Sequence, residues 1–338
     1  MQRCLSLAQK GIGTTRPNPS VGAVVVVDDK IIGEGFTSPY GGLHAEVNAI
    51  RSVKDDDLLK KSTIYVTLEP CSHFGKTPPC SDLIIEKGIP NVVVGCLDTN
   101  SLVSGRGIRR LRDSGLNVVT GVLENECKEH HKRFFTFHEK KRPYIILKWA
   151  ESKDRFIAPK ERVQRAPVWI TNEFSRQLVH QWRSEEHAIL VGTKTVIEDN
   201  PKLNVRLYNG QDPVRVVIDR SLKISKDSHV YDQSVRTIFI TEKIKENSKN
   251  LIFEQVNFTK PLAIQICEIL HQHNIQSIII EGGSQTLQTF IDEDLWDEAR
   301  VFTGDSKFAG GIKGPILSKD SIKERKLKSD QLNIFKND

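Results

Sequence analysis

Residues 63–87 read TIYVTLEPCSHFGKTPPCSDLIIEK, and this stretch decides the fold of the first half of the chain. The β-branched and aromatic run at 63–68 predicts a buried strand, and the run at 81–87 predicts a helix that follows a pair of prolines. We therefore expect Cys71 at the end of a strand and Cys80 at a helix N-terminus, a position that favours a thiolate.

His44 and Glu46 extend the two cysteines into a metal-binding pattern. One imidazole and two thiolates are a suitable set of protein ligands for a catalytic zinc ion that keeps a water in its fourth position. In zinc deaminases a glutamate that is not a ligand passes a proton to the departing amine, and Glu46 has the spacing for that role. The alternative is a structural zinc site with His73 as fourth ligand, which leaves Glu46 without a role. We expect Zn²⁺ on His44, Cys71 and Cys80, with Glu46 as the catalytic acid and base.

Strand-like and helix-like segments alternate through the first half of the chain. Strands are expected at 22–27, 63–68 and 91–96, and helices from His44, at 81–87 and at 105–114. This alternation is typical of a three-layer α/β/α domain. A second series of strands begins at 143–149, after a charged stretch, so we expect domains at 1–141 and 142–338.

The second half also predicts an α/β domain, because strand-like runs again alternate with turn and helix signals. These runs lie at 188–192, 214–219, 237–241 and 277–281. The last one continues into Gly282-Gly283 and a helix-like segment at 285–291. Glycines between a strand and a helix let backbone amides approach a phosphate, although a tight turn is the alternative interpretation.

Length and composition place the chain among globular proteins. Its 338 residues suffice for two domains, and 38% hydrophobic and 27% charged residues are ordinary proportions. No apolar run is long enough to span a bilayer, and the first residues lack the architecture of a signal peptide. Six cysteines are too few for a disulfide scaffold. We expect a cytoplasmic protein without a membrane partner.

The net charge of +6 raises the question of nucleic-acid binding. Aromatic and basic residues interleave at 128–142, a pattern that would suit stacking on single strands. The alternative is an exposed helix whose phenylalanines pack inward, which we favour because most charge runs are solvated faces. An RNA-binding editor and a zinc-stabilised interaction module nevertheless remain alternatives to an enzyme acting on a small molecule.

The chain resembles the bifunctional deaminase/reductase family of riboflavin biosynthesis at a series of ordered motifs. The family's zinc loop has the form Pro-Cys-Ser-His-x-Gly-x-Thr-Pro-Pro-Cys, which residues 70–80 match. Further matching motifs are PNPSVGA at 17–23, HAEVNA at 44–49, DTN at 98–100, GRG at 105–107, WIT at 169–171, AILVG at 188–192, DNP at 199–201 and EGG at 281–283. The resemblance covers essentially the whole chain.

This resemblance implies a cytidine-deaminase-like domain followed by a dihydrofolate-reductase-like domain. It implies zinc-dependent hydrolytic deamination of 2,5-diamino-6-(5-phosphoribosylamino)pyrimidin-4(3H)-one. NADPH-dependent reduction of the ribosyl group then gives 5-amino-6-(5-phosphoribitylamino)uracil. The alternative is a deaminase for another pyrimidine or for RNA, with a second domain that is degenerate or serves in binding. The expected partner is thus a phosphoribosylated pyrimidine rather than nucleic acid, and we expect a homo-oligomer.

The resemblance also implies roles for single residues. The positions that match substrate contacts of the deaminase are Asn18, Lys76, Asp98 and Asn100, and those of the reductase are Arg183, Leu203, Arg206 and Glu281. NADPH contacts match Trp169, Thr195, Asp199 and Gly283. Lys148 matches a lysine near the reacting centre and is expected to be catalytic, although an exposed lysine at a strand end is the alternative. For Asn18, which lies between two prolines, the alternative is a turn.

The chain departs from the family pattern at three places, where a glycine, a serine and two prolines are replaced. Arg155 replaces a glycine, which removes tolerance for positive φ and adds bulk. Pro167 stands where the family often has a serine that donates to the substrate, and proline has no such donor. Thr99 and Ser101 replace two prolines. The departures at 155 and 167 lie in the reductase half, so we expect them to affect the nearby NADPH contacts and a substrate contact, while the deaminase motifs match the family more closely.

Overall fold

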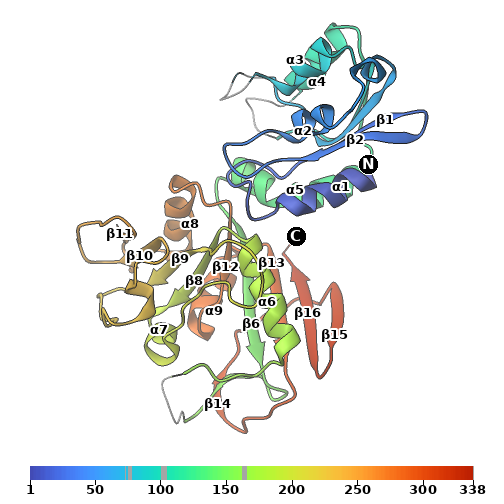
Figure 1. Ribbon diagram of the computed structural model, residues 1–338. Coiled ribbons are helices and arrows are strands. Elements are labelled where there is room, and N and C mark those ends of the chain that lie inside the picture. The colour runs from blue at the N-terminus through green and yellow to red at the C-terminus, as the bar shows by residue number, and fades with distance from the viewer. Residues whose placement is uncertain (73, 75–77, 100–104, 162–165, 338) are drawn as a thin grey trace. The chain divides into compact units, whose positions relative to one another are not determined.

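Contacts divide the chain into two units, Met1–Lys141 and Arg142–Asp338, and each unit has its own sheet (Figure 1). The computed structural model describes residues 1–72, 74, 78–99, 105–161 and 166–337. No helix in the described ranges is both long and apolar enough to cross a membrane.

The first unit contains a five-stranded sheet in the order β2-β1-β3-β4-β5. β1 (Gly22–Val27) is antiparallel to β2 (Lys30–Phe36) and to β3 (Thr63–Leu68). β3, β4 (Asn91–Cys96) and β5 (Asn117–Thr120) are parallel. The carboxyl ends of these three strands therefore lie at one edge of the sheet, where Cys71 follows β3.

Helices cover both faces of this sheet. They are α1 (Gln2–Ala8), α2 (Ala45–Arg51), α3 (Cys80–Glu86), α4 (Arg106–Asp113) and α5 (Glu124–Glu139), with short 3₁₀ helices at Gln9–Gly11 and Asp56–Lys61. Alternate residues of β1 point to opposite faces: Val25 packs in a core with Ala49 of α2, and Val24 packs against Leu7 of α1. The expected three-layer α/β/α fold is confirmed.

The aromatic and basic segment near the end of the first unit belongs to α5. Its His131, Phe134, Phe135 and Phe137 are buried. These rings are therefore not available to stack on nucleic-acid bases. The interpretation of this segment as a helix with inward-packed phenylalanines is confirmed.

The second unit has a nine-stranded sheet in the order β11-β10-β9-β8-β12-β6-β13-β16-β15. Its parallel strands are β6 (Tyr144–Glu151), β8 (Ala188–Gly192), β9 (Val214–Ile218), β10 (Thr237–Thr241), β11 (Leu251–Gln255), β12 (Ser277–Ile280) and β13 (Glu298–Thr303). β16 (Asp330–Lys336) and β15 (Lys323–Leu327) add an antiparallel edge. β7 (Phe156–Pro159) and β14 (Gly311–Lys313) form a separate pair.

Helices pack on both faces of the second sheet as well. They are α6 (Glu173–Glu185), α7 (Thr193–Asp199), α8 (Leu262–Gln272) and α9 (Ser284–Asp292), with a 3₁₀ turn at His229–Tyr231. Trp182 of α6 packs with Phe302 on one face, and Phe290 of α9 packs with Ile278 on the other. Parallel strands carry binding sites beyond their carboxyl ends, which here lead into α7, α9 and the segment after β13.

Candidate active sites

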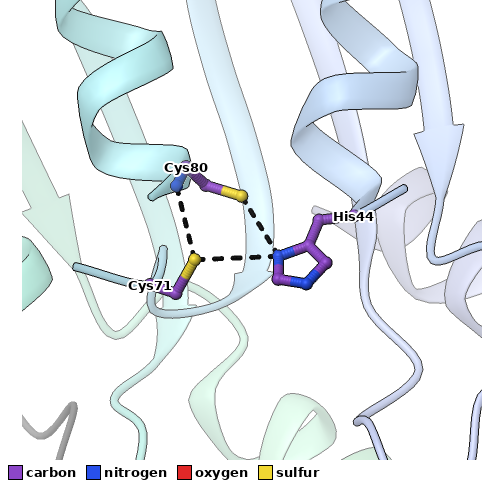
Figure 2. Close-up of side chains that lie close together, drawn as sticks. All are labelled: His44, Cys71 and Cys80. Carbon is purple, nitrogen blue, oxygen red and sulfur yellow. Dashed lines mark hydrogen bonds between the residues drawn. The ribbon is translucent and has the colours of Figure 1, made fainter. Parts of the chain in front are cut away.

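His44, Cys71 and Cys80 form a compact cluster in the first unit (Figure 2). The Nδ1 atom of His44 lies 3.3 Å from Sγ of Cys80 and 3.7 Å from Sγ of Cys71. All three ligand atoms lie within 4.8 Å of one another. This separation allows a single metal ion to contact all three.

Secondary-structure ends hold the three side chains in place. His44 is the N-cap residue of α2, and Cys80 is the first residue of α3. The backbone N–H of Cys80 donates to Sγ of Cys71 at 3.3 Å. The carbonyl of Cys71 accepts hydrogen bonds from Ser81, from its backbone N–H at 3.1 Å and from Oγ at 3.0 Å. The partial positive charge of a helix N-terminus favours thiolates at this point.

Hydrogen bonding gives the thiols of Cys71 and Cys80 different pKa values. The hydrogen bond with Cys80, aided by His44, lowers the pKa of Cys71 to about 4 although burial opposes this shift. The same hydrogen bond, together with burial, raises the pKa of Cys80 well above its ordinary value. The two cysteines thus hold one thiol proton between them, and a metal ion that binds both as thiolates displaces that proton.

Glu46 lies in the first turn of α2 and is buried, with 4% of its surface exposed. Burial, with a smaller effect from the charge of Cys71, raises its pKa to about 7. A carboxyl group with a pKa near neutrality can both accept and release a proton, as general acid–base catalysis requires.

The donor set of this cluster fits zinc. Two sulfurs and one imidazole nitrogen are ligands that zinc accepts, and three protein ligands leave a fourth position for water. Among the residues that the structure describes, the metal-binding group comprises His44, Cys71 and Cys80. His73, the fourth ligand of the structural alternative, lies outside the described residues.

The structure describes only some of the residues that we expect to contact the substrate of the deaminase. Asn18 lies in a bend, where its backbone N–H donates to the carbonyl of Thr15 at 3.0 Å. Asp98 follows β4 and is buried. Lys76 and Asn100 lie outside the described residues, as does Ser101, while Thr99 is described.

In the second unit, Lys148, Arg183 and Glu281 form a largely buried charged group. Arg183 Nη2 lies 2.6 Å from Oε2 of Glu281, and Lys148 Nζ lies 3.9 Å from Oε1. Burial raises the pKa of Glu281, but the charges of Arg183 and Lys148 prevail and lower it to about 2. Burial and repulsion from Arg183 lower the pKa of Lys148. Lys148 lies within β6 with 15% of its side chain exposed, so the alternative of an exposed lysine at a strand end is wrong.

His180 is a residue of this site that our reading of the sequence missed. It lies on α6, one turn before Arg183, and its Nδ1 accepts the backbone N–H of Arg206 at 3.1 Å. Burial and the neighbouring cations Arg183 and Arg206 lower its pKa to about 4, so the ring is neutral at pH 7. The sequence signal for His180 was its position three residues before Arg183, which places both side chains on one face of the helix.

Leu203 lies on the loop between α7 and Arg206, where it is buried with φ of 57°.

Glycines and threonines meet where β8 and β12 lead into α7 and α9. A Cβ atom at Gly192 would lie 2.6 Å from Oγ1 of Thr286, and one at Gly283 would lie 3.8 Å from Oγ1 of Thr195. Gly283 is the N-cap residue of α9, so the expected strand, glycine pair and helix are confirmed. The absence of side chains and the helix N-terminus suit the pyrophosphate of a dinucleotide, and these residues therefore fit NADPH.

The other two residues that match NADPH contacts lie on different elements. Asp199 is the last residue of α7, the helix that carries Thr195. Trp169 precedes α6, is 59% exposed, and has the guanidinium of Arg176 at 4.9 Å from its ring centroid. An exposed aromatic ring beside a cation is a surface on which a planar group can stack.

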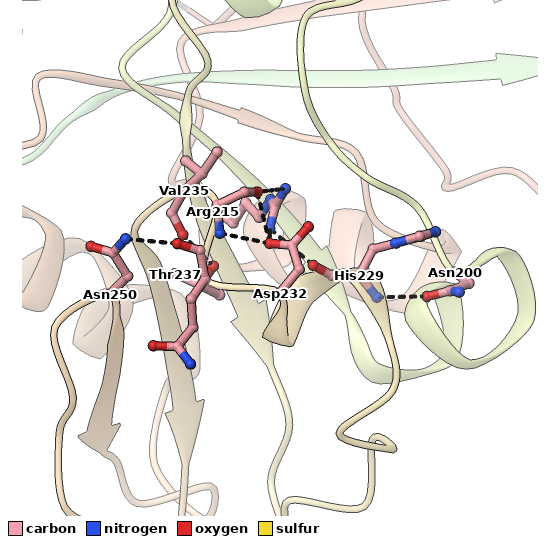
Figure 3. A network of polar contacts seen from close by, with 9 residues as sticks. Asn200, Arg215, His229, Asp232, Val235, Thr237 and Asn250 are labelled. Carbon is pink, nitrogen blue, oxygen red and sulfur yellow. Dashed lines mark hydrogen bonds and ion pairs between the residues drawn. The ribbon is translucent and has the colours of Figure 1, made fainter.

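A buried arginine fixes the end of α7 (Figure 3). Arg215 on β9 is 1% exposed, and its Nη1 donates to Asp232 at 2.7 Å and to the carbonyl of His229 at 3.0 Å. The backbone N–H of His229 in turn donates to Oδ1 of Asn200 at 2.9 Å. Asn200 caps α7 in the left-handed conformation, so this network holds the helix that carries Thr195.

The structure also describes Arg155 and Pro167, the two residues of this unit that depart from the family pattern. Arg155 adopts a φ of 67°, a left-handed conformation that favours glycine, and its side chain is 78% exposed. The guanidinium therefore extends into solvent and pairs loosely with Glu151 at 3.7 Å. Pro167 is exposed.

Comparisons with known families cover both units. Residues 143–338 match the family described as RibD C-terminal domain. Residues 1–96 match the family described as the zinc-binding region of cytidine and deoxycytidylate deaminases. The chain is 40% identical to a riboflavin biosynthesis protein RibD of Aquifex aeolicus, over 98% of this chain and 94% of that protein. It is 34% identical to the RibD of Escherichia coli K12, over 93% and 89%.

Two solved structures are similar to this chain over nearly its whole length. A diaminohydroxyphosphoribosylaminopyrimidine deaminase/5-amino-6-(5-phosphoribosylamino)uracil reductase from Thermotoga maritima is 38% identical, with a TM-score of 0.90 over 99% of this chain and 97% of that one. RibD of Acinetobacter baumannii is 29% identical, with a TM-score of 0.87 over 98% and 96%. The expected pairing of a cytidine-deaminase-like unit with a reductase unit is confirmed.

Proposed function

This chain belongs to the RibD family of bifunctional deaminase/reductases of riboflavin biosynthesis, and from that premise we propose which of its residues carry each reaction. The enzyme is a zinc-dependent deaminase and an NADPH-dependent reductase that acts on a pyrimidine derivative. The matches cover both halves of the chain, which supports two activities over a deaminase with a degenerate or RNA-binding second half.

For the first reaction we propose 2,5-diamino-6-(5-phosphoribosylamino)pyrimidin-4(3H)-one as substrate, since the Thermotoga relative carries the corresponding name. His44, Cys71 and Cys80 would hold the zinc, which when bound polarises a water and lowers its pKa. Glu46 would take a proton from the attacking water at a carboxylate oxygen and give it to the amino nitrogen that leaves as ammonia. The single observation that carries this assignment is the buried Glu46 beside the three-ligand cluster.

Asn18 and Asp98 would orient the pyrimidine, together with Lys76 and Asn100. A flat ring with several donors and acceptors needs convergent polar groups to fix its orientation. The burial of Asp98 beside the strand end that precedes the zinc ligands supports its assignment.

In the second reaction NADPH, when bound, would supply the hydride that reduces the sugar carbon carrying the nitrogen. The ring oxygen released from that carbon needs a proton, and we assign its donation to Nζ of Lys148. The lowered pKa of Lys148 supports this role because the ammonium gives up its proton more readily than an ordinary lysine. Arg183, Arg206 and Glu281 would bind the phosphorylated sugar, with Leu203 as an apolar contact, since the guanidinium fork pairs with phosphate.

Trp169, Thr195, Asp199 and Gly283 would bind NADPH. Gly283 at the start of α9 supports this assignment, because a Cβ atom there would lie only 3.8 Å from Oγ1 of Thr195 on α7. We further propose that the protein is a cytoplasmic homo-oligomer without nucleic-acid or membrane partners. The reduced thiols that zinc requires suit that compartment.

Zinc removal tests whether deamination and reduction take place at separate sites. We expect the chelated and dialysed protein to release ammonia at least about a hundredfold more slowly, because the attacking water loses its Lewis acid. NADPH oxidation with the deaminated intermediate as substrate should change less than about twofold. The measurement is an ammonia assay and NADPH absorbance on the same sample, before and after zinc is restored. Equal loss of both activities would contradict two independent sites.

A further inference from the structure

Glu69, two residues before the zinc ligand Cys71, accepts four backbone hydrogen bonds through its carboxylate. Its Oε2 receives the N–H groups of Asp98 at 3.3 Å and Gly105 at 3.0 Å. Its Oε1 receives those of Gly107 at 2.9 Å and Ile108 at 3.3 Å. The residue is buried, with 4% of its surface exposed. Four backbone N–H donors from residues 98–108 thus converge on one buried side chain.

Two of these hydrogen bonds cap a helix from a distant part of the chain. Gly105 is the N-cap residue of α4 and has no side chain with which to accept the free N–H groups of the first turn. Glu69 accepts from Gly107 and Ile108, the second and third residues of the helix, as an N-cap side chain normally does. A carboxylate here also complements the positive end of the helix dipole.

The other contacts of Glu69 connect this cap to the deaminase site. Asp98, a proposed substrate contact, follows β4 and donates its N–H to the same carboxylate. Gly107 lies so close to the carbonyl of Pro70 that a Cβ atom would collide with it. The segment 69–71 thus touches the start of α4, the start of α3 and the backbone of Asp98.

We propose that Glu69 is a positioning residue of the deaminase, which fixes Asp98 and the start of α4 relative to the zinc ligands. This inference rests on the proposed deaminase function. Because Glu69 lies between β3 and Cys71, a shift of its carboxylate changes the distance between the metal and the groups that orient the pyrimidine. Its loss is expected to weaken substrate binding while the zinc stays in place.

The test is Glu69→Gln in the full chain. Glutamine has the same size but turns one acceptor oxygen into an NH₂ group, which then faces two N–H donors. We expect KM for the diaminopyrimidine to rise about tenfold, with kcat within about threefold of the wild type and one zinc per chain. NADPH oxidation with the deaminated intermediate should be unchanged. Should Glu69→Gln fail to fold, Glu69→Asp provides the same readout, because a shorter side chain withdraws the carboxylate from the amides.

Glu293 provides a matched control in the second unit. Its carboxylate accepts backbone N–H groups at the start of α8, from Leu262 at 2.9 Å, Ala263 at 3.2 Å and Ile264 at 3.2 Å. Glu293→Gln should leave the deaminase KM unchanged. An unchanged KM in the Glu69 variants, or loss of zinc together with kcat, would overturn the proposal. Absence of ammonia release from the wild type would instead refute the deaminase function itself.

Discussion

Glu46→Gln is expected to lower kcat of the deaminase by about a thousandfold. Positioned acid and base groups contribute roughly 10²- to 10⁴-fold, and glutamine can neither accept nor release the proton that the amino group needs. Zinc content should stay at one per chain, since the metal-binding group consists of His44, Cys71 and Cys80. The measurement is steady-state ammonia release, with metal analysis of the same preparation.

Glu124→Gln serves as the control for this substitution in the same unit. Glu124 lies at the surface on α5, where it pairs with Lys128 at 2.7 Å. Exposed pairs of this kind contribute little, so ammonia release should stay within about twofold of the wild type. The assignment of Glu46 would be wrong if Glu46→Gln kept ammonia release within tenfold, or if it lost zinc.

Glu281→Gln is expected to damage both the stability of the second unit and the reductase. The variant leaves the cations of Lys148 and Arg183 without their buried counter-charge, and removal of one partner of a buried pair costs about 3 kcal/mol or more. kcat/KM for NADPH-dependent reduction should fall about a hundredfold, because even small displacements of orienting groups have effects of that size. Urea unfolding and NADPH oxidation followed by absorbance measure the two effects.

Glu173→Gln is a control for the loss of a charge in the second unit. Glu173 pairs with Lys328 at 3.8 Å, and both side chains are well exposed. The free energy of unfolding should change by less than about 1 kcal/mol. If Glu281→Gln behaved like this control in both assays, the charged group around Lys148 would not be the reductase site.

The zinc cluster could be predicted from sequence because its chemistry leaves a local pattern. His44 and Glu46 lie at one helix start, Cys71 follows a strand end, and Cys80 begins the next helix. The burial that raises the pKa of Glu46 follows from that placement. The central strands could be predicted because parallel strands are continuous apolar runs.

Other features of the sites depend on partners that are distant in sequence. The carboxylate of Glu69 accepts N–H groups that lie between 29 and 39 residues away, and backbone amides carry no sequence signal. His180 accepts the N–H of Arg206, 26 residues away, which only the folded loop after α7 brings near it. The antiparallel edge was missed because β15 is mostly exposed and charged, and because β16 mixes polar and apolar residues without a clear alternation of buried and exposed positions.

Arg155 shows how tertiary contacts override a local preference. A left-handed conformation costs a non-glycine residue about 1 kcal/mol, yet Arg155 adopts it. The neighbouring Asp154 accepts backbone N–H groups of Phe308 at 3.1 Å and Ala309 at 2.7 Å, and these contacts hold the turn. The left-handed turn is thus formed without glycine at this position, so Arg155 does not by itself exclude reductase activity.

The central claim is that one chain carries out a deamination and then a reduction at two separate sites. The most direct measurement incubates the purified, zinc-loaded protein with the diaminopyrimidine phosphoribosyl substrate and NADPH, and follows ammonia and NADPH in parallel. We predict one NADPH oxidised for each ammonia released, with ammonia appearing first. Ammonia release without NADPH oxidation would contradict the two-site assignment, and zinc-loaded protein that produced neither signal would contradict the function as a whole.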